Sequence, residues 1–223
     1  MSVVVAISTV ADGSMLKRGH PSDAEVIENR TSFLKTLDIQ FEQTTRLKLS
    51  FETADFCRYA EVTNANKGDG METDSDTPLD GIVTTKLNHA LFLPIADCVG
   101  AIFYDPIHQI LGLAHLGRHS LEQYGGQKFV TYLQVHYHCH PKDIQVWLSP
   151  APGKDVYPIW ALDNKGLKEA TFEQLYAAGI MPSHITDNPS ETDKDHTYFS
   201  YSEFLKSHRP IDGDHAIVAI MRS

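Results

Sequence analysis

Hydrophobic residues along this chain occur as short, often β-branched runs between polar turns, and as three longer segments with apolar positions at helical spacing. A short apolar run bounded by turn residues is typical of a strand, whereas a recurrence every three to four residues is typical of a helix. The runs predict strands at residues 3–8, 47–51, 82–85, 90–96, 100–104, 110–115, 144–148 and 216–221. The longer segments predict helices at residues 24–37, 121–137 and 167–178. Pro21, Ser22 and Asp23 provide a capping sequence for the first helix.

The order of these elements indicates the fold class. Strands concentrate in the middle of the chain and helices flank them in mixed order, which favours an α+β fold over a regular βαβ winding. We expect a single domain covering residues 1–223, built as a layered α/β sandwich with a mixed central sheet flanked by helices. Residues 64–79 are polar and lack periodicity, so we expect them to form an exposed loop.

Net charge narrows the range of partners. The chain has 19 Lys and Arg against 29 Asp and Glu, which gives a formal net charge of -10. Such a charge repels nucleic acid polymers and anionic membrane surfaces, so neither is expected as a partner. A small anion such as phosphate remains compatible with the sequence, because a few local cations or helix N-terminal amides are enough to hold it.

The three cysteines, Cys57, Cys98 and Cys139, form a sparse and odd set. This count argues against a disulfide framework and for a reducing compartment. The first ten residues lack a basic leader, and no segment reaches the roughly 20 apolar residues of a membrane span. We therefore expect a cytoplasmic protein, and the sequence leaves its oligomeric state open.

Cys98 and His115 are the candidate reactive pair. Both lie at predicted strand ends, 17 positions apart (115 − 98), so an antiparallel hairpin would bring thiol and imidazole together. One use of such a pair is a zinc site, which needs a third protein ligand and an open position for water. Another is covalent catalysis, with Cys98 as nucleophile, His115 as base and Asp97 orienting the ring. Spacing alone also fits a buried cysteine and histidine with purely structural roles.

A resemblance adds to this interpretation. The motifs that carry it are Ala96-Asp97-Cys98, Asp105-Pro106, Ala114-His115-Leu116-Gly117, the segment Val26 to Arg30, and Tyr198-Phe199-Ser200-Tyr201. They resemble the laccase-domain (YfiH-like) family, which has an Ala-Asp-Cys strand end, an Asp-Pro turn and an Ala-His-Ala-Gly-Trp-Arg-Gly stretch. The resemblance extends over nearly the whole chain and implies one domain with a mixed sheet between helices.

The family's known activities give expectations for this chain. Members are described as zinc-dependent enzymes of purine nucleosides that carry out phosphorolysis and adenosine deamination, and older descriptions call them copper polyphenol oxidoreductases. The resemblance implies a zinc ion (Zn²⁺) held by Cys98 and His115, assistance from Asp97, and nucleoside and phosphate as small-molecule substrates. Arg30 and Arg118 are the candidate substrate-binding cations. Copper is less expected, because a blue-copper site needs two histidines, a cysteine and a weak axial ligand.

The sequence departs from the family in two places. The family's Gln-Val-His-Gly motif supplies a third ligand, but the stretch taken as equivalent here, residues 58–61, has no histidine. Glu61 is the candidate replacement because carboxylate oxygen also binds zinc, with His89 and His119 as alternatives. The family's Trp-Arg-Gly and double arginine are also replaced, by Arg118-His119-Ser120 and by Ser202-Glu203. Two alternatives therefore stay open: a metal-free cysteine hydrolase, and a degenerate domain that binds a ligand or partner without turnover.

Two further polar clusters receive structural interpretations. His136, His138 and His140 lie at a predicted helix end, where imidazoles interact favourably with the helix dipole, and alternate positions do not share one helical face. The acidic residues within 69–76 lack the spacing of a calcium loop and are expected to be solvated.

Overall fold

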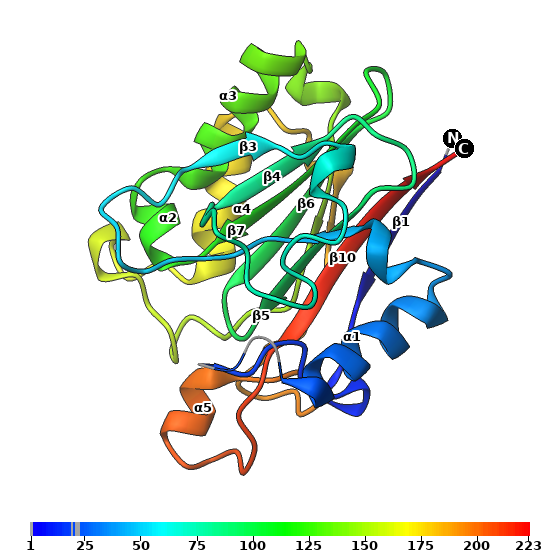
Figure 1. Cartoon of the computed structure of the whole chain (residues 1–223). Helices are drawn as coiled ribbons and strands as arrows, with labels where there is room; N and C mark the ends of the chain where they lie inside the picture. Colours follow the sequence, from blue (N-terminus) through cyan, green and yellow to red (C-terminus); the bar gives the residue numbers. More distant parts are fainter. Residues whose placement is uncertain (1, 19, 21–22) are drawn as a thin grey trace.

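The strands form two mixed sheets in the computed structural model, which describes residues 2–18, 20 and 23–223 (Figure 1). One sheet has the order β1 (Ser2–Ile7), β10 (His215–Arg222), β5 (Ala90–Ile95) and β2 (Thr44–Arg46). The other has the order β3 (Tyr59–Glu61), β4 (Gly81–Thr84), β7 (Ile110–Leu116), β6 (Val99–Asp105), β8 (Gln145–Leu148) and β9 (Ile185–Asp187). The predicted α+β class is confirmed, with the strands divided between two sheets where one central sheet was expected.

Helices cover the outer faces of the two sheets (Figure 1). The α-helices are α1 (Ala24–Thr36), α2 (Arg118–Glu122), α3 (Gly125–Tyr137), α4 (Leu167–Ala177) and α5 (Tyr201–Leu205). Short 3-10 turns occur at Val10–Asp12, Phe41–Gln43, Asn64–Asn66, Pro141–Asp143, Trp160–Leu162 and Pro182–His184. Helix α1 packs on the four-stranded sheet, α3 and α4 pack on the six-stranded sheet, and α5 lies at one end of the sandwich.

Three apolar clusters hold these layers together. Phe33, Leu34 and Phe92 belong to the cluster under α1, whereas Phe129 and Leu175 belong to the cluster under α3 and α4. The third cluster lies between the sheets and includes Leu93, Ile102, Leu113 and Ile217. The central strands are thus covered on both faces, which explains why they read as continuous apolar runs.

Most predicted elements form, and the exceptions are short or irregular. The predicted helix over residues 121–137 is broken at Tyr124, whose left-handed φ of 62° separates α2 from α3. The predicted strand over residues 47–51 does not form, and Phe51 is 67% exposed. The Asp23 carboxylate caps α1 by accepting a 3.0 Å bond from the Glu25 amide; Pro21 and Ser22 lie outside the described residues.

The chain crosses from one sheet to the other at residues 96–98. Strand β5 ends at Ile95 and β6 begins at Val99, so only three residues make the transition. Asp97 has a left-handed φ of 81°, an uncommon conformation for a residue with a side chain. This crossing fixes the position of Cys98 at one end of the sandwich.

The state of the cysteines and the length of the helices relate to the expectation of a reducing, non-membrane environment. Cys57, Cys98 and Cys139 are all free thiols. Cys139 is buried, while the other two are partly exposed. Among the described helices, none has both the length and the apolar character needed to cross a bilayer.

Candidate functional site

Cys98 and His115 meet at the end of the β6–β7 hairpin, as the sequence predicts. The two strands are antiparallel, with Gly100 opposite His115 and Val99 opposite Leu116, so Cys98 lies level with Gly117. A Cβ atom placed on Gly117 would lie 3.0 Å from the Cys98 Sγ and 3.0 Å from the His115 Nε2. The thiol and the imidazole therefore border the same small space, which Gly117 leaves open.

Burial sets the protonation of this pair. It lowers the pKa of His115 to about 4, with the Asp80 carboxylate opposing the change. It raises the pKa of the Cys98 thiol to about 12, and the neighbouring Asp97 carboxylate adds to the rise. At neutral pH the site therefore holds a thiol and a neutral imidazole. A cysteine nucleophile needs a depressed thiol pKa, so this arrangement disfavours a metal-free cysteine hydrolase.

Two cavities open on either side of the pair. A cavity of about 580 Å³ is bordered by residues 16–18, 46–49 and Asp74, and a cavity of about 390 Å³ is bordered by residues 117–120, Tyr157 and Tyr201. Both are lined by Arg18, Phe51, Ala96, Cys98 and His115. The reactive pair therefore lies where the two cavities adjoin.

The larger cavity is cationic. Lys17, Arg18, Arg46 and Lys48 line it, against the carboxylates Asp74 and Asp214. Arg46 and Lys48 both pair with Asp74, and Arg18 lies 3.1 Å from the Asp214 carboxylate. In a chain of net charge -10, this excess of positive charge marks a local site for an anion.

The smaller cavity is aromatic. Phe56 stacks on His119 with ring centroids 4.7 Å apart, and the Phe51 and His115 rings are nearly perpendicular with centroids 6.4 Å apart. The Arg18 guanidinium lies 3.8 Å from the centre of the Tyr201 ring. Flat, apolar faces with a nearby cation are suited to a heteroaromatic ring.

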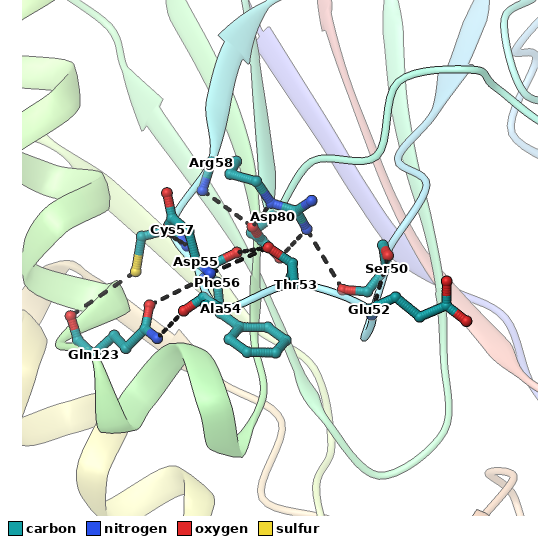
Figure 2. Close-up of polar contacts among 10 residues, drawn as sticks. All are labelled: Ser50, Glu52, Thr53, Ala54, Asp55, Phe56, Cys57, Arg58, Asp80 and Gln123. Atoms are coloured by element: carbon teal, nitrogen blue, oxygen red, sulfur yellow. Dashed lines mark hydrogen bonds and ion pairs between the residues drawn. The ribbon is translucent and has the colours of Figure 1, made fainter.

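The loop that carries Phe51 and Phe56 is held by hydrogen bonds on its Phe56 side (Figure 2). Arg58 donates to both Asp80 carboxylate oxygens, at 2.8 and 3.2 Å, and the Asp80 carbonyl accepts from the His115 amide at 2.9 Å. Next to Arg58 in the chain, the Gln123 side chain accepts from the Phe56 amide at 3.0 Å and donates to the Ala54 carbonyl at 2.8 Å. These bonds connect the aromatic loop to β4, β7 and α2.

Asp97 anchors the opposite wall. Its carboxylate accepts a 2.8 Å bond from the Thr192 hydroxyl and a 2.7 Å bond from the Ser202 amide. Asp97 is buried and borders the aromatic cavity. Both oxygens are thus engaged in holding residues 192 and 202 beside Cys98, a positioning role.

The two predicted substrate-binding arginines lie in different places. Arg118 begins α2 and borders the aromatic cavity, with its buried Nε atom lacking a hydrogen-bond partner among the described residues. The prediction for Arg30 is corrected, because this residue of α1 is fully buried and borders neither cavity. Its Nε and one terminal nitrogen donate to the Met15 and Met71 carbonyls at 2.8 and 2.6 Å.

Arg30 is therefore expected to affect stability. Replacing it by leucine leaves both carbonyl acceptors unpaired, and we expect the free energy of unfolding to fall by about 3 kcal/mol. Lys35→Leu, at an exposed position of the same helix, is expected to change it by less than about 0.5 kcal/mol. Urea unfolding followed by circular dichroism measures both; equal effects of the two changes would contradict a structural role for Arg30.

The structure does not bring Glu61 to the pair. β3 runs parallel to β4 with Tyr59 opposite Gly81 and Glu61 opposite Val83, which directs the chain away from the His115 end of β7. Glu61 accepts from the Thr85 hydroxyl and borders a different cavity. The segment facing Cys98 and His115 is residues 46–51.

The alternative histidines do not complete a three-ligand set either. His89 is buried with its Nε2 2.7 Å from the Thr45 hydroxyl, and His119 stacks on Phe56. Among the described residues, the one group of three possible ligands with atoms within 4.8 Å of one another lies elsewhere. The donor set at Cys98 and His115 thus falls one protein ligand short of a catalytic zinc site.

Asp214 is a site residue that the sequence did not single out. It is buried in the wall of the cationic cavity, and burial raises its carboxyl pKa to about 7, aided by Asp212 and Asp97 and opposed by Arg18. It lies 196 positions from Arg18, with which it pairs. The available signal was a carboxylate immediately before the closing apolar strand, which by itself is common.

The sequence of this chain is similar to a known protein family and to curated proteins. A sequence model of the family described as multi-copper polyphenol oxidoreductase laccase matches residues 16–161. The chain is 29% identical over 143 residues to "Purine nucleoside phosphorylase YlmD" of Bacillus subtilis (strain 168), covering 63% of this chain and 50% of that protein. It is 30% identical over 151 residues to the protein of the same name from Geobacillus stearothermophilus, covering 56% of this chain and 55% of that protein. The chain spans about half the length of these curated relatives.

A solved structure matches over a longer range. The crystal structure of the Bacillus licheniformis hypothetical protein YfiH superposes with a TM-score of 0.83, covering 99% of this chain and 93% of that chain. The sequence identity is 20%, so this likeness concerns the fold alone.

Proposed function

The chain belongs to the family described as multi-copper polyphenol oxidoreductase laccase, and from this membership and the two adjoining cavities we propose that it catalyses phosphorolysis of purine nucleosides. The observation that carries the proposal is the junction of an aromatic and a cationic cavity at Cys98 and His115. A purine base fits the aromatic side and phosphate fits the cationic side. The names of the two YlmD relatives support the same substrate class.

In the proposed reaction, phosphate approaches from the cationic cavity and the base leaves on the side of the aromatic cavity. A phosphate oxygen attacks C1′ of the ribose while the bond from C1′ to the base breaks, and the bonding electron pair leaves with the base. The base then needs a proton, and the attacking hydrogen phosphate loses one as the new ester forms. Arg18, Lys17 and Lys48 are positioned to bind the phosphate, and Phe51 and Phe56 to stack on the base.

Asp214 lines the cationic cavity close to Cys98, whose thiol pKa it helps to raise, so it lies next to the junction of the two cavities. It is the group best suited to supply the proton. With a pKa of about 7, its carboxyl is partly protonated at neutral pH, whereas His115 is almost entirely neutral. A general acid works best when its pKa lies near the operating pH. His115 and Cys98 then act as neutral neighbours that shape the space at the reacting carbon.

The family description names copper, so the family is associated with a metal. Zinc is the ion implied by the resemblance, but among the residues that the structure describes only Cys98 and His115 are in place, where a catalytic zinc needs three protein ligands. The proposed reaction therefore relies on the chain's own side chains. The same shortfall favours a second candidate, a domain that binds nucleoside and phosphate without turnover.

The test is incubation of the purified chain with inosine, guanosine and adenosine, with and without phosphate, followed by chromatographic separation. We expect free base and a ribose phosphate to form only when phosphate is present. Conversion of adenosine to inosine would indicate deamination at the same site. Saturable thermal stabilisation by a nucleoside without any product would instead support the binding domain.

The aromatic loop is expected to determine nucleoside affinity. Replacing Phe56 by leucine removes the stacking surface beside His119, and we expect KM for the nucleoside to rise up to about tenfold with a smaller change in kcat. Trp160→Leu is the control, since it removes an aromatic ring that is 75% exposed and borders neither cavity. A KM unchanged in the Phe56 variant would exclude the loop from base binding.

A further inference from the structure

A second cluster of cysteine, histidine and carboxylate lies at the opposite end of the β6–β7 hairpin from Cys98. Asp105 ends β6, His108 lies in the turn that follows, and Cys139 comes just after the left-handed residue that ends α3. One ligand atom from each of these three side chains lies within 4.8 Å of the other two. The turn of the hairpin and the end of α3 therefore meet at this cluster.

Asp105 is a buried carboxylate held by hydrogen bonds from the turn that follows it. One carboxylate oxygen accepts from the Ile107 and His108 amides at 2.7 and 3.0 Å, and the other lies 2.8 Å from the His108 Nδ1. The residue is only 2% exposed. Within the described part of the chain, neither a lysine nor an arginine forms an ion pair with it, and its one charge partner is the imidazole. A buried carboxylate of this kind is stabilised by a cation close by.

Cys139 directs its sulfur toward the same point. It is 3% exposed, and burial together with the adjacent Asp105 carboxylate raises the pKa of its thiol to about 12. Without a metal ion the thiol keeps its proton and faces the Asp105 carboxylate as a hydrogen-bond donor, because a thiolate there would face a like charge. Binding of a metal ion reverses this, since a coordinated thiol loses its proton to the solvent.

We propose that Asp105, His108 and Cys139 bind Zn²⁺ or a similar thiophilic divalent cation. Thiolate, imidazole and carboxylate are the three donor types that zinc takes in proteins. Two anionic ligands and one neutral ligand balance a divalent ion, so the complex is neutral at a mostly buried position. His108 is exposed, which leaves access for the ion and a fourth position for water.

The proposed ion would clip the hairpin turn to the end of α3. Loss of the ion is then expected to loosen residues 105–110 and 138–140, far along the strands from Cys98 and His115. The site is independent of the proposed phosphorolysis. It also involves the His-Tyr-His-Cys-His tract in an unexpected way, through Cys139, since none of its three histidines belongs to the cluster.

The experiment is a cobalt titration of the metal-free, full-length chain in which Cys98→Ser removes the thiol of the other site. Co²⁺ bound to a thiolate gives a charge-transfer band in the near ultraviolet. We expect the Cys98→Ser protein to bind one equivalent with this band, and the band to disappear when Cys139→Ser is added. Adding His108→Asn instead is expected to weaken cobalt binding by about 10- to 100-fold.

His140→Asn, added to Cys98→Ser, is the matched control. His140 is an exposed imidazole next to Cys139 that lies outside the cluster, so we expect cobalt binding to be unchanged. His108 is a surface residue, so its variant decides the question even if Cys139→Ser fails to fold, which circular dichroism reports. Absence of the thiolate band in Cys98→Ser, or equal cobalt affinity in the His108 and His140 variants, would overturn the proposal.

Discussion

Replacing Gly117 by alanine is expected to reduce kcat/KM for nucleoside phosphorolysis by about 100-fold, while the chain stays folded. The added methyl group would occupy the space that Cys98 and His115 share. It would lie 2.7 Å from the His115 Cε1 and 3.0 Å from the Cys98 Sγ, so one of these side chains must move. Both are held by the paired strands of the hairpin, and the displacement falls on the groups nearest the reacting carbon.

The backbone contributes nothing to this expected loss. Gly117 has φ −85° and ψ 174°, extended values that alanine adopts without strain. Gly166 offers a matched control: it also precedes a helix, has φ −71° and ψ 160°, and an added Cβ would contact Lys154 far from the cavities. Steady-state kinetics and urea unfolding of both variants distinguish an effect on the reaction centre from a general effect of adding a methyl group before a helix. Equal kinetic losses in the two variants would contradict a reaction centre at Cys98 and His115.

The part of the site that the sequence predicts is the part built from local pairing. Cys98 and His115 lie at the ends of two apolar runs joined by an Asp-Pro turn, and such runs form a hairpin with a defined register. The pairing of neighbouring strands depends on residues close in sequence. This explains why the spacing of Cys98 and His115 predicts their contact but does not predict the residues that surround them.

The surroundings depend on contacts that spacing does not encode. Position within a motif makes Glu61 and Arg30 candidates, but β3 pairs in a register that carries Glu61 away, and α1 buries Arg30 against main-chain carbonyls. Phe51 ends an apolar run that reads as a strand, yet it lies exposed on the loop over the site. Arg18 and Asp214 meet only because the two ends of the chain converge through β1 and β10.

Asp214→Asn is expected to lower kcat by 100- to 10,000-fold, the range typical of a lost general acid. Asparagine keeps the shape of the side chain and an oxygen that accepts from Arg18, but it has no proton to transfer. In the wild-type chain, kcat should fall as pH rises through about 7, because the carboxyl must be protonated to act. The variant should lose this pH dependence along with the activity.

We expect Asp214→Asn to raise the free energy of unfolding at alkaline pH although it lowers kcat. A loss of activity through misfolding would lower both. The folded-state pKa of Asp214 is raised from 3.8 to about 7, so the folded chain binds more protons than the unfolded chain between these values. Wild-type stability is therefore lost as pH rises across this window, by up to about 1.4 kcal/mol per pH unit. Asparagine carries no charge, so the variant should be more stable than wild type at pH 8 and should gain nothing at pH 3.

Asp212→Asn provides the control for both measurements. Asp212 also pairs with Arg18, but it is partly exposed and borders neither cavity. Its variant should keep the wild-type dependence of kcat on pH. An Asp214 variant that is both inactive and less stable than wild type at pH 8 would show that the carboxylate holds the fold through Arg18. Loss of activity with a gain in stability is the pattern expected of a buried acid kept protonated for transfer to the departing base.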